Sequence, residues 1–139
     1  MIVRALLVVA GVLPFLPGLF EGVPGLAVAG RWVDDWLEFQ CGRDPDRMLA
    51  VGAACARCLG IYVGLGLGAL VARPRLPAGV LLRFVLGGLA LLALDVGTEA
   101  LLDRPAWAPL RVATGLAFAY PAGVLAVLAF SRPAQGAAR

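Results

Sequence analysis

The chain has 139 residues, of which 61% are hydrophobic, with a net charge of +3 and no histidine. Soluble domains are roughly 45–50% apolar, so this composition excludes an ordinary soluble domain and makes the lipid bilayer the expected surroundings. The missing histidine excludes His-based acid–base catalysis, His metal ligands and Ser-His-Asp triads. All 12 basic residues are arginine and form no basic stripe, so nucleic acid is not an expected partner.

Four apolar stretches are long enough to cross a bilayer, which takes about 20 mostly apolar residues. They cover residues 2–20, 48–72, 78–102 and 109–130. Proline-containing turns separate the last three stretches, because proline breaks a helix. The sequence therefore predicts an all-α fold: one membrane domain, residues 1–139, with a bundle of four transmembrane helices.

The long connection after the first stretch predicts a further short helix, at residues 31–39. Trp32, Trp36 and Phe39 recur there at i, i+4 and i+7, with acidic residues between them. This pattern is typical of an amphipathic helix that lies at the membrane surface with its aromatic face among the headgroups.

The arginines near the ends of the stretches indicate an orientation. On one side the arginines have no acidic neighbours, whereas seven acidic residues accompany those on the other side. This favours both termini in the cytoplasm and the long connection outside. As an alternative, Arg4, the apolar run and residues 27–29 also fit a cleavable signal peptide, whose removal would leave three spans.

Thiol and ionisable groups gather at the predicted outer end of the bundle. Cys55 and Cys58 share one helix face, about two turns inside the second span, and Asp95 and Glu99 share a face near the end of the third. The residues expected at this level are Cys41, Cys55, Arg57, Cys58, Asp95, Thr98, Glu99, Arg104 and Arg111.

Charged groups inside a membrane are costly and usually pair with one another. Arg57 is the expected partner of Asp95 or Glu99, and Arg111 is the second candidate, because a guanidinium can engage a carboxylate with two hydrogen bonds. Small residues also recur at every fourth position from Gly52 to Gly68. That spacing lets a neighbouring helix approach closely, and we expect the second and third spans to pack together.

The residues around these cysteines resemble one family. The stretch Cys55-Ala-Arg-Cys-Leu-Gly-Ile-Tyr-Val-Gly64 is similar to the C-A-R-C-x-G-I-Y-x-G signature of small predicted membrane proteins grouped as domain of unknown function 2085. Weaker matches, in the same order as in the family, are Cys41, Pro45 and Arg47, then Asp95 and Thr98 with Glu99 in place of a Gln, then Arg104, Leu110 and Arg111.

The resemblance covers roughly residues 40–125, with two departures from the family pattern. Gly42 stands where the family has His, and residues 105–108 replace a polar E-S-x-N run. The resemblance implies a protein of a bacterial or archaeal cell (inner) membrane. It implies no established reaction, so it indicates a site rather than an activity.

The first hypothesis for this site is a metal ion. Cys41, Cys55 and Cys58 could supply three thiolates, with Asp95 or Glu99 as a fourth ligand. Zinc prefers four tetrahedral ligands, and thiolates also suit copper(I) or an iron–sulfur centre. The alternative is that cysteines in a lipid-embedded helix are simply small apolar residues.

Thiol redox chemistry is the second hypothesis, with Cys41 as a shuttle for the Cys55/Cys58 pair. A pair well inside a span argues against it, and a structural Cys41–Cys55 or Cys41–Cys58 bond is an alternative. The acidic and arginine residues could line a transport pocket, hold a shared proton or divalent ion, or form a buried ion-pair network that fixes helix register. Four spans are few for a transporter unless the chain forms a homo-oligomer, which the sequence leaves open.

The sequence thus favours a small multi-pass membrane protein with a Cys, acidic and Arg site near the outer face. We expect that site to bind a metal ion or to be structurally cross-linked. A thiol-redox or other membrane-embedded enzyme is the alternative.

Overall fold

The computed structural model describes residues 1–41, 54–72, 77–102, 105 and 107–131. The elements formed by these residues are all helices, as the sequence predicts. In chain order they are α1 (Ile2–Val12), the 3₁₀ helix η1 (Leu13–Phe15), α2 (Leu16–Glu21), α3 (Ala27–Cys41), α4 (Ala56–Val71), α5 (Ala78–Leu102) and α6 (Ala108–Ser131).

Among the described residues, three helical segments are long and apolar enough to cross a membrane. They are Ile2–Glu21, Ala78–Leu102 and Ala108–Ser131, and α4 is a shorter apolar helix of 16 residues. The second predicted span therefore differs from the structure at its start, because Cys55 is not helical and α4 begins at Ala56. Residues 48–53 of that prediction lie outside the described residues.

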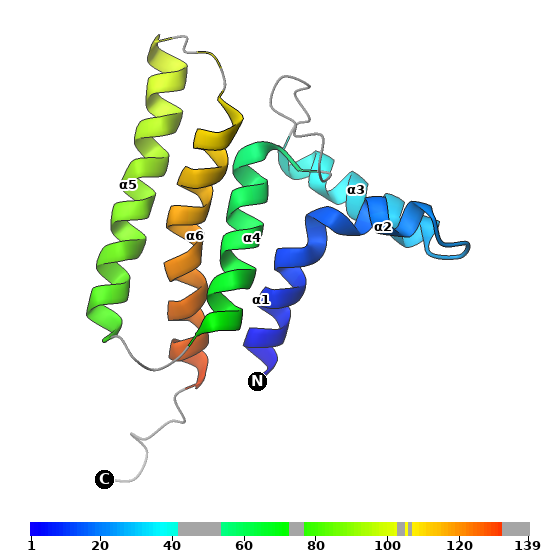
Figure 1. Cartoon of the computed structure of the whole chain (residues 1–139), viewed down its shortest axis with the longest axis horizontal. Coiled ribbons are helices and arrows are strands. Elements are labelled where there is room, and N and C mark those ends of the chain that lie inside the picture. Colours follow the sequence, from blue (N-terminus) through cyan, green and yellow to red (C-terminus); the bar gives the residue numbers. More distant parts are fainter. Residues whose placement is uncertain (42–53, 73–76, 103–104, 106, 132–139) are drawn as a thin grey trace.

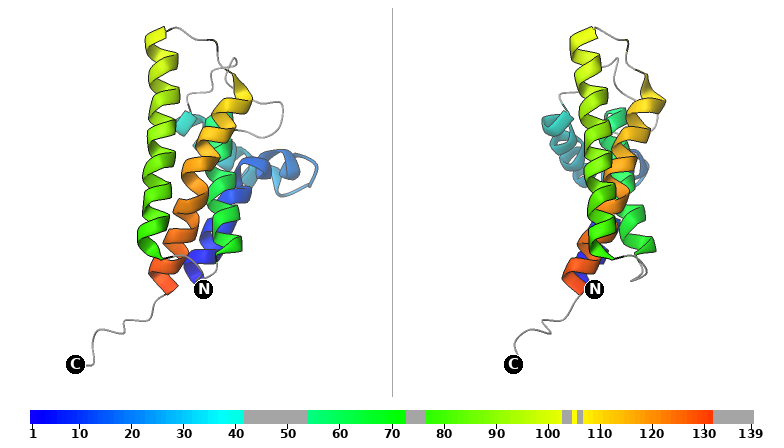
Figure 2. Two further views of the ribbon diagram at one scale, coloured as in Figure 1. Left: turned by 60° about the vertical axis from the view of Figure 1, so that its left-hand side comes forward. Right: turned by 90° about the vertical axis from the view of Figure 1, so that its left-hand side faces the viewer.

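The helices α1, α4, α6 and α5 stand side by side in that order, with α6 between α4 and α5 (Figure 1). The N-terminus and the end of α6 lie at the same end of this bundle (Figure 2). The expected pairing of the second and third spans is wrong, because α4 packs mainly on α6 and α5 also packs on α6.

Glycines at the contact explain why α4 packs closely on α6. A Cβ added at Gly60 or Gly68 would run into a backbone carbonyl of α6, and one at Gly64 would lie 2.9 Å from the Cβ of Ala119. From the other side, a Cβ at Gly115 would lie 2.5 Å from the carbonyl oxygen of Arg57. The two backbones touch along small-residue strips of both helices, as small-xxx-small packing allows.

The outer helices join the bundle through glycines as well. A Cβ at Gly11 of α1 would lie 2.7 Å from the Cα of Gly66 in α4. A Cβ at Gly88 of α5 would lie 2.6 Å from the carbonyl oxygen of Ala117 in α6. The α4 helix thus has glycines on two faces and contacts a neighbouring backbone on each.

The first apolar stretch bends instead of continuing straight. Pro14 lies buried in η1 and Pro17 is buried in α2. Proline lacks an N–H and crowds the preceding turn, which kinks a helix. After the bend, α2 and α3 run roughly across the direction of the bundle helices (Figure 1). At the other end of α1, Arg4 donates a hydrogen bond of 2.5 Å to the carbonyl oxygen of Ala72 and ties α1 to the end of α4.

Substituting Gly60 with Ala should destabilise the bundle, because the new methyl group overlaps the backbone of α6. Overpacking of this kind costs about 1–3 kcal/mol. Reversible unfolding in mixed detergent and SDS micelles measures the change. Gly87→Ala is the matched control, since a Cβ there meets nothing within 4 Å. Equal unfolding free energies for the two variants would contradict the proposed role of backbone contact between α4 and α6.

Candidate functional site

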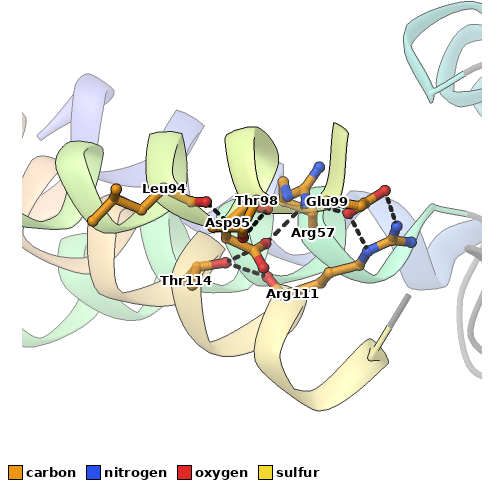
Figure 3. A network of polar contacts seen from close by, with 7 residues as sticks. All are labelled: Arg57, Leu94, Asp95, Thr98, Glu99, Arg111 and Thr114. Atoms are coloured by element: carbon orange, nitrogen blue, oxygen red, sulfur yellow. Dashed lines mark hydrogen bonds and ion pairs between the residues drawn. The ribbon is translucent and has the colours of Figure 1, made fainter. Parts of the chain in front are cut away.

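A network of polar contacts joins three helices near one end of the bundle (Figure 3). Arg57 comes from the second position of α4, Asp95 and Glu99 come from the last two turns of α5, and Arg111 and Thr114 come from the first two turns of α6. These ends meet because α4 and α6 start, and α5 finishes, at the end of the bundle away from the N-terminus (Figure 1).

Two arginines and two carboxylates form the centre of this network. Nη2 of Arg57 lies 2.8 Å from Oδ2 of Asp95 and 3.1 Å from Oε2 of Glu99. Arg111 donates two hydrogen bonds to Glu99, from Nε to Oε2 at 3.1 Å and from Nη2 to Oε1. Glu99 is therefore shared by both arginines, and the four side chains together carry no net charge.

The charges in this network are buried, so their mutual compensation is important for stability. The side chain of Asp95 is 2% exposed and that of Arg111 is 4% exposed. Taking such charges out of water costs several kcal/mol each, which only close pairing offsets. The network therefore behaves as a unit, since loss of one partner leaves a charge buried with fewer partners. The buried Nε of Arg57 has no hydrogen-bond partner among the described residues, so the network leaves one donor unsatisfied there.

The two threonines differ in what they contact. Thr98, a candidate from the sequence, donates to the carbonyl oxygen of Leu94 at 2.8 Å, which lies in its own helix. Thr114 lies 3.3 Å from Oδ2 of Asp95 and so links α6 to α5. The sequence interpretation missed Thr114. Its signal is a hydroxyl three residues after Arg111, on the same face of an otherwise apolar helix.

Cys55 and Cys58 lie at the start of α4. Cys55 is the N-cap residue, with extended backbone (φ −63°, ψ 155°), and Cys58 is the third residue of the helix. The expectation that both cysteines lie in a helix is wrong for Cys55, which precedes α4, whereas the depth of the thiols in the membrane stays a prediction. Arg57 lies between the two cysteines in sequence, so the thiols and the ion-pair network share the first turn of α4.

Other predicted site residues cannot be placed with these. The side chain of Cys41, at the end of α3, and Arg104 lie outside the described residues. Within the described residues, no group of three or more cysteine and acidic side chains is arranged to hold a metal ion. Metal ligation by Cys41, Cys55 and Cys58 with Asp95 or Glu99 stays a prediction.

Long apolar helices packed through glycines around a buried ion-pair network define a small helical membrane protein. Residues 41–125 match the family described as predicted membrane protein (DUF2085), and the chain belongs to that family. The match confirms the resemblance inferred from the sequence, and its range includes the cysteines and the whole network. No curated protein and no solved structure matches the chain.

Replacing Arg57 with Met should leave Asp95 buried with weaker compensation. An unsatisfied buried group costs about 1–3 kcal/mol, and adding Asp95→Asn should recover part of that loss. Unfolding in mixed micelles of the single and double variants gives the coupling energy. Arg83→Met is the control, because Arg83 is exposed on α5 and away from the network. Additive effects of Arg57→Met and Asp95→Asn would show that the pair contributes nothing to stability.

Proposed function

We propose that this membrane protein carries out thiol–disulfide exchange at Cys55 and Cys58, on the outer side of the membrane. The observation that carries the proposal is the position of the two cysteines at the N-cap and third residue of α4. These two positions are one helical turn apart, at the N-cap and N3 of α4. Two cysteines at this spacing at a helix start have the arrangement of a Cys-X-X-Cys motif, whose thiols form and break a disulfide.

The helix start also suits the chemistry. Thiolate is the reactive form of cysteine, and the N–H groups and positive dipole end of a helix stabilise a negative charge there. The guanidinium of Arg57 lies in the same turn, with its charge balanced by the carboxylates of the network. Its contacts with Asp95 and Glu99, at 2.8 and 3.1 Å, hold it toward α5. This arrangement supports a nucleophilic thiolate whose surroundings are fixed by the network.

The exchange needs a second dithiol or disulfide, most simply on another protein. One thiolate of the pair attacks a sulfur of the partner's disulfide, which forms a mixed disulfide and releases one partner thiolate. The second thiolate then attacks the sulfur of the first, which closes the Cys55–Cys58 bond and releases the other partner thiolate. The released thiolates take protons from water. The site is oxidised by two electrons, the partner is reduced by two, and the reverse sequence reduces the site.

The second candidate function is a thiolate metal site of Cys41, Cys55 and Cys58. Two thiols within the first turn of one helix support it. Its fourth ligand is less well supported, since Asp95 and Glu99 already contact arginines at 2.8 and 3.1 Å. A metal that used either carboxylate would have to displace Arg57. A cross-link from Cys41 to the pair is the structural variant of the same idea.

Thiol counting with a maleimide mass tag tests these alternatives on the purified full chain in nanodiscs, equilibrated in glutathione redox buffers. Thiol exchange predicts that two thiols disappear together at one potential and that Cys41→Ser leaves this transition unchanged, whereas Cys55→Ser abolishes it. Three reactive thiols at every potential would contradict thiol exchange. Bound metal at one per chain, lost in Cys55→Ser, would establish the metal site instead. Loss of the transition in Cys41→Ser would indicate a structural cross-link.

The proposed orientation has its own test. Arginine distribution and the common end shared by the N-terminus and the end of α6 support both termini in the cytoplasm. A green fluorescent protein fused after residue 139 should therefore fluoresce, and an alkaline phosphatase fused there should be inactive. The opposite pattern would place the thiols in the cytoplasm and remove the outer-side assignment. Phosphatase fusion within the long connection, at residue 44, serves as the matched control.

A further inference from the structure

The α3 helix divides into three faces of different chemistry. Successive residues turn by about 100° around a helix, which puts the centres of these faces about 120° apart. The first is packed and contains Gly30, Val33 and Leu37; the second is aromatic and contains Trp32, Trp36 and Phe39; the third is acidic and contains Asp34, Asp35 and Glu38. We infer that the aromatic face is a lipid-docking surface, seated in the headgroup region of the same bilayer that the bundle crosses.

The packed face accounts for how α3 is held. Leu37 is fully buried, and a Cβ at Gly30 would lie 3.1 Å from the Cβ of Phe20 in α2. The aromatic face is not used in this packing. Trp32 is 74% exposed, Trp36 45% and Phe39 89%. Three large aromatic side chains on one helix face are costly to leave in water.

The contact with α4 indicates the direction in which the aromatic face points. The rings of Trp36 and Tyr62 lie 6.3 Å apart, and the hydroxyl of Tyr62 donates to Oε1 of Gln40 at 2.6 Å. Tyr62 is the seventh residue of α4 and lies further from the network end than Cys55 does. The aromatic face therefore turns toward the middle of the bundle, and the acidic face turns away from it.

A bilayer is the occupant that fits these observations. The chain belongs to a membrane-protein family, and α2 and α3 run across the bundle direction where α1 ends (Figure 1). Tryptophan is enriched at the headgroup level, where its ring is apolar and its N–H meets water. The acidic face, about 120° further around the helix, suits water and not hydrocarbon. Helices with this division of faces lie in the plane of the interface.

A headgroup position for α3 also determines where the thiols lie, whatever their reaction. Cys55 precedes Tyr62 by seven residues, which is about 10 Å along α4 at the helical rise. If the rings of α3 mark the headgroup level, the first turn of α4 lies on the water side of it. The half-buried thiols of Cys55 and Cys58 are then open to a water-soluble partner.

Tryptophan fluorescence in proteoliposomes tests the inference, because the chain has three tryptophans. Trp36→Phe with Trp107→Phe keeps Trp32, and Trp32→Phe with Trp36→Phe keeps Trp107, which is 60% exposed just before α6. Lipids brominated near the headgroup end of the acyl chains should remove about half the emission of Trp32, as for a ring about 5–10 Å into the headgroup–acyl boundary. The same lipids should quench Trp107 less, and bromine at the chain ends should quench Trp32 less.

Each other outcome overturns the inference. Quenching of Trp32 by aqueous acrylamide and not by brominated lipid would place the face in water. Protection from both quenchers would mean that protein, such as a second copy of this chain, covers it. Stronger quenching by bromine at the chain ends would place α3 in the hydrocarbon. Unfolding in mixed micelles checks that the conservative Phe variants keep the fold.

Discussion

Backbone contact between α4 and α6 determines where the ion-pair network can form. Glycines on both helices allow it, and Gly115 lies directly against the carbonyl of Arg57, where a Cβ would be 2.5 Å away. That contact sets the position of Arg57, which must reach past α6 to the carboxylates of α5. With bulkier residues in the strip, α4 would move outward, and Asp95 would lose the guanidinium that makes its burial tolerable.

The central position of α6 also explains which helix supplies each partner in the ion-pair network. Arg111 and Thr114 contact α5 directly, since α6 packs on it, and Arg57 completes the set from the far side. The carboxylate of Glu99 pairs with both arginines. It therefore connects α5 to α4 and α5 to α6, and it links α4 to α6 as well. The network has no net charge, so little charge is left uncompensated in the bundle. It forms only when the ends of all three helices are in register. Its role in holding that register follows from geometry alone, whatever chemistry the thiols perform.

Sequence reasoning identified the ion pairs but not the packing around them. Pairing of Arg57 with Asp95 or Glu99 follows from the cost of isolated charge in a membrane. The sequence did not predict that α6 is the neighbour of α4. Both α5 and α6 contain small residues on which α4 could pack, and residue spacing does not show which of the two helices it prefers. The start of α4 was missed for a related reason. The residues just before Cys55 are as apolar as a helix interior, so hydropathy gives no boundary there.

That boundary changes what the cysteines can do. Within a span, Cys55 and Cys58 would be small apolar residues with little thiolate character. At the N-cap and in the first turn of α4, they meet the positive end of a helix, next to an arginine whose guanidinium is fixed by two carboxylates. A crosswise α3 at the headgroup level would leave this turn facing water while the rest of α4 faces the bundle. The α3 helix would then lie between the thiols and the hydrocarbon. Cysteines at the start of α4 would therefore react in water although the rest of the helix is in the membrane.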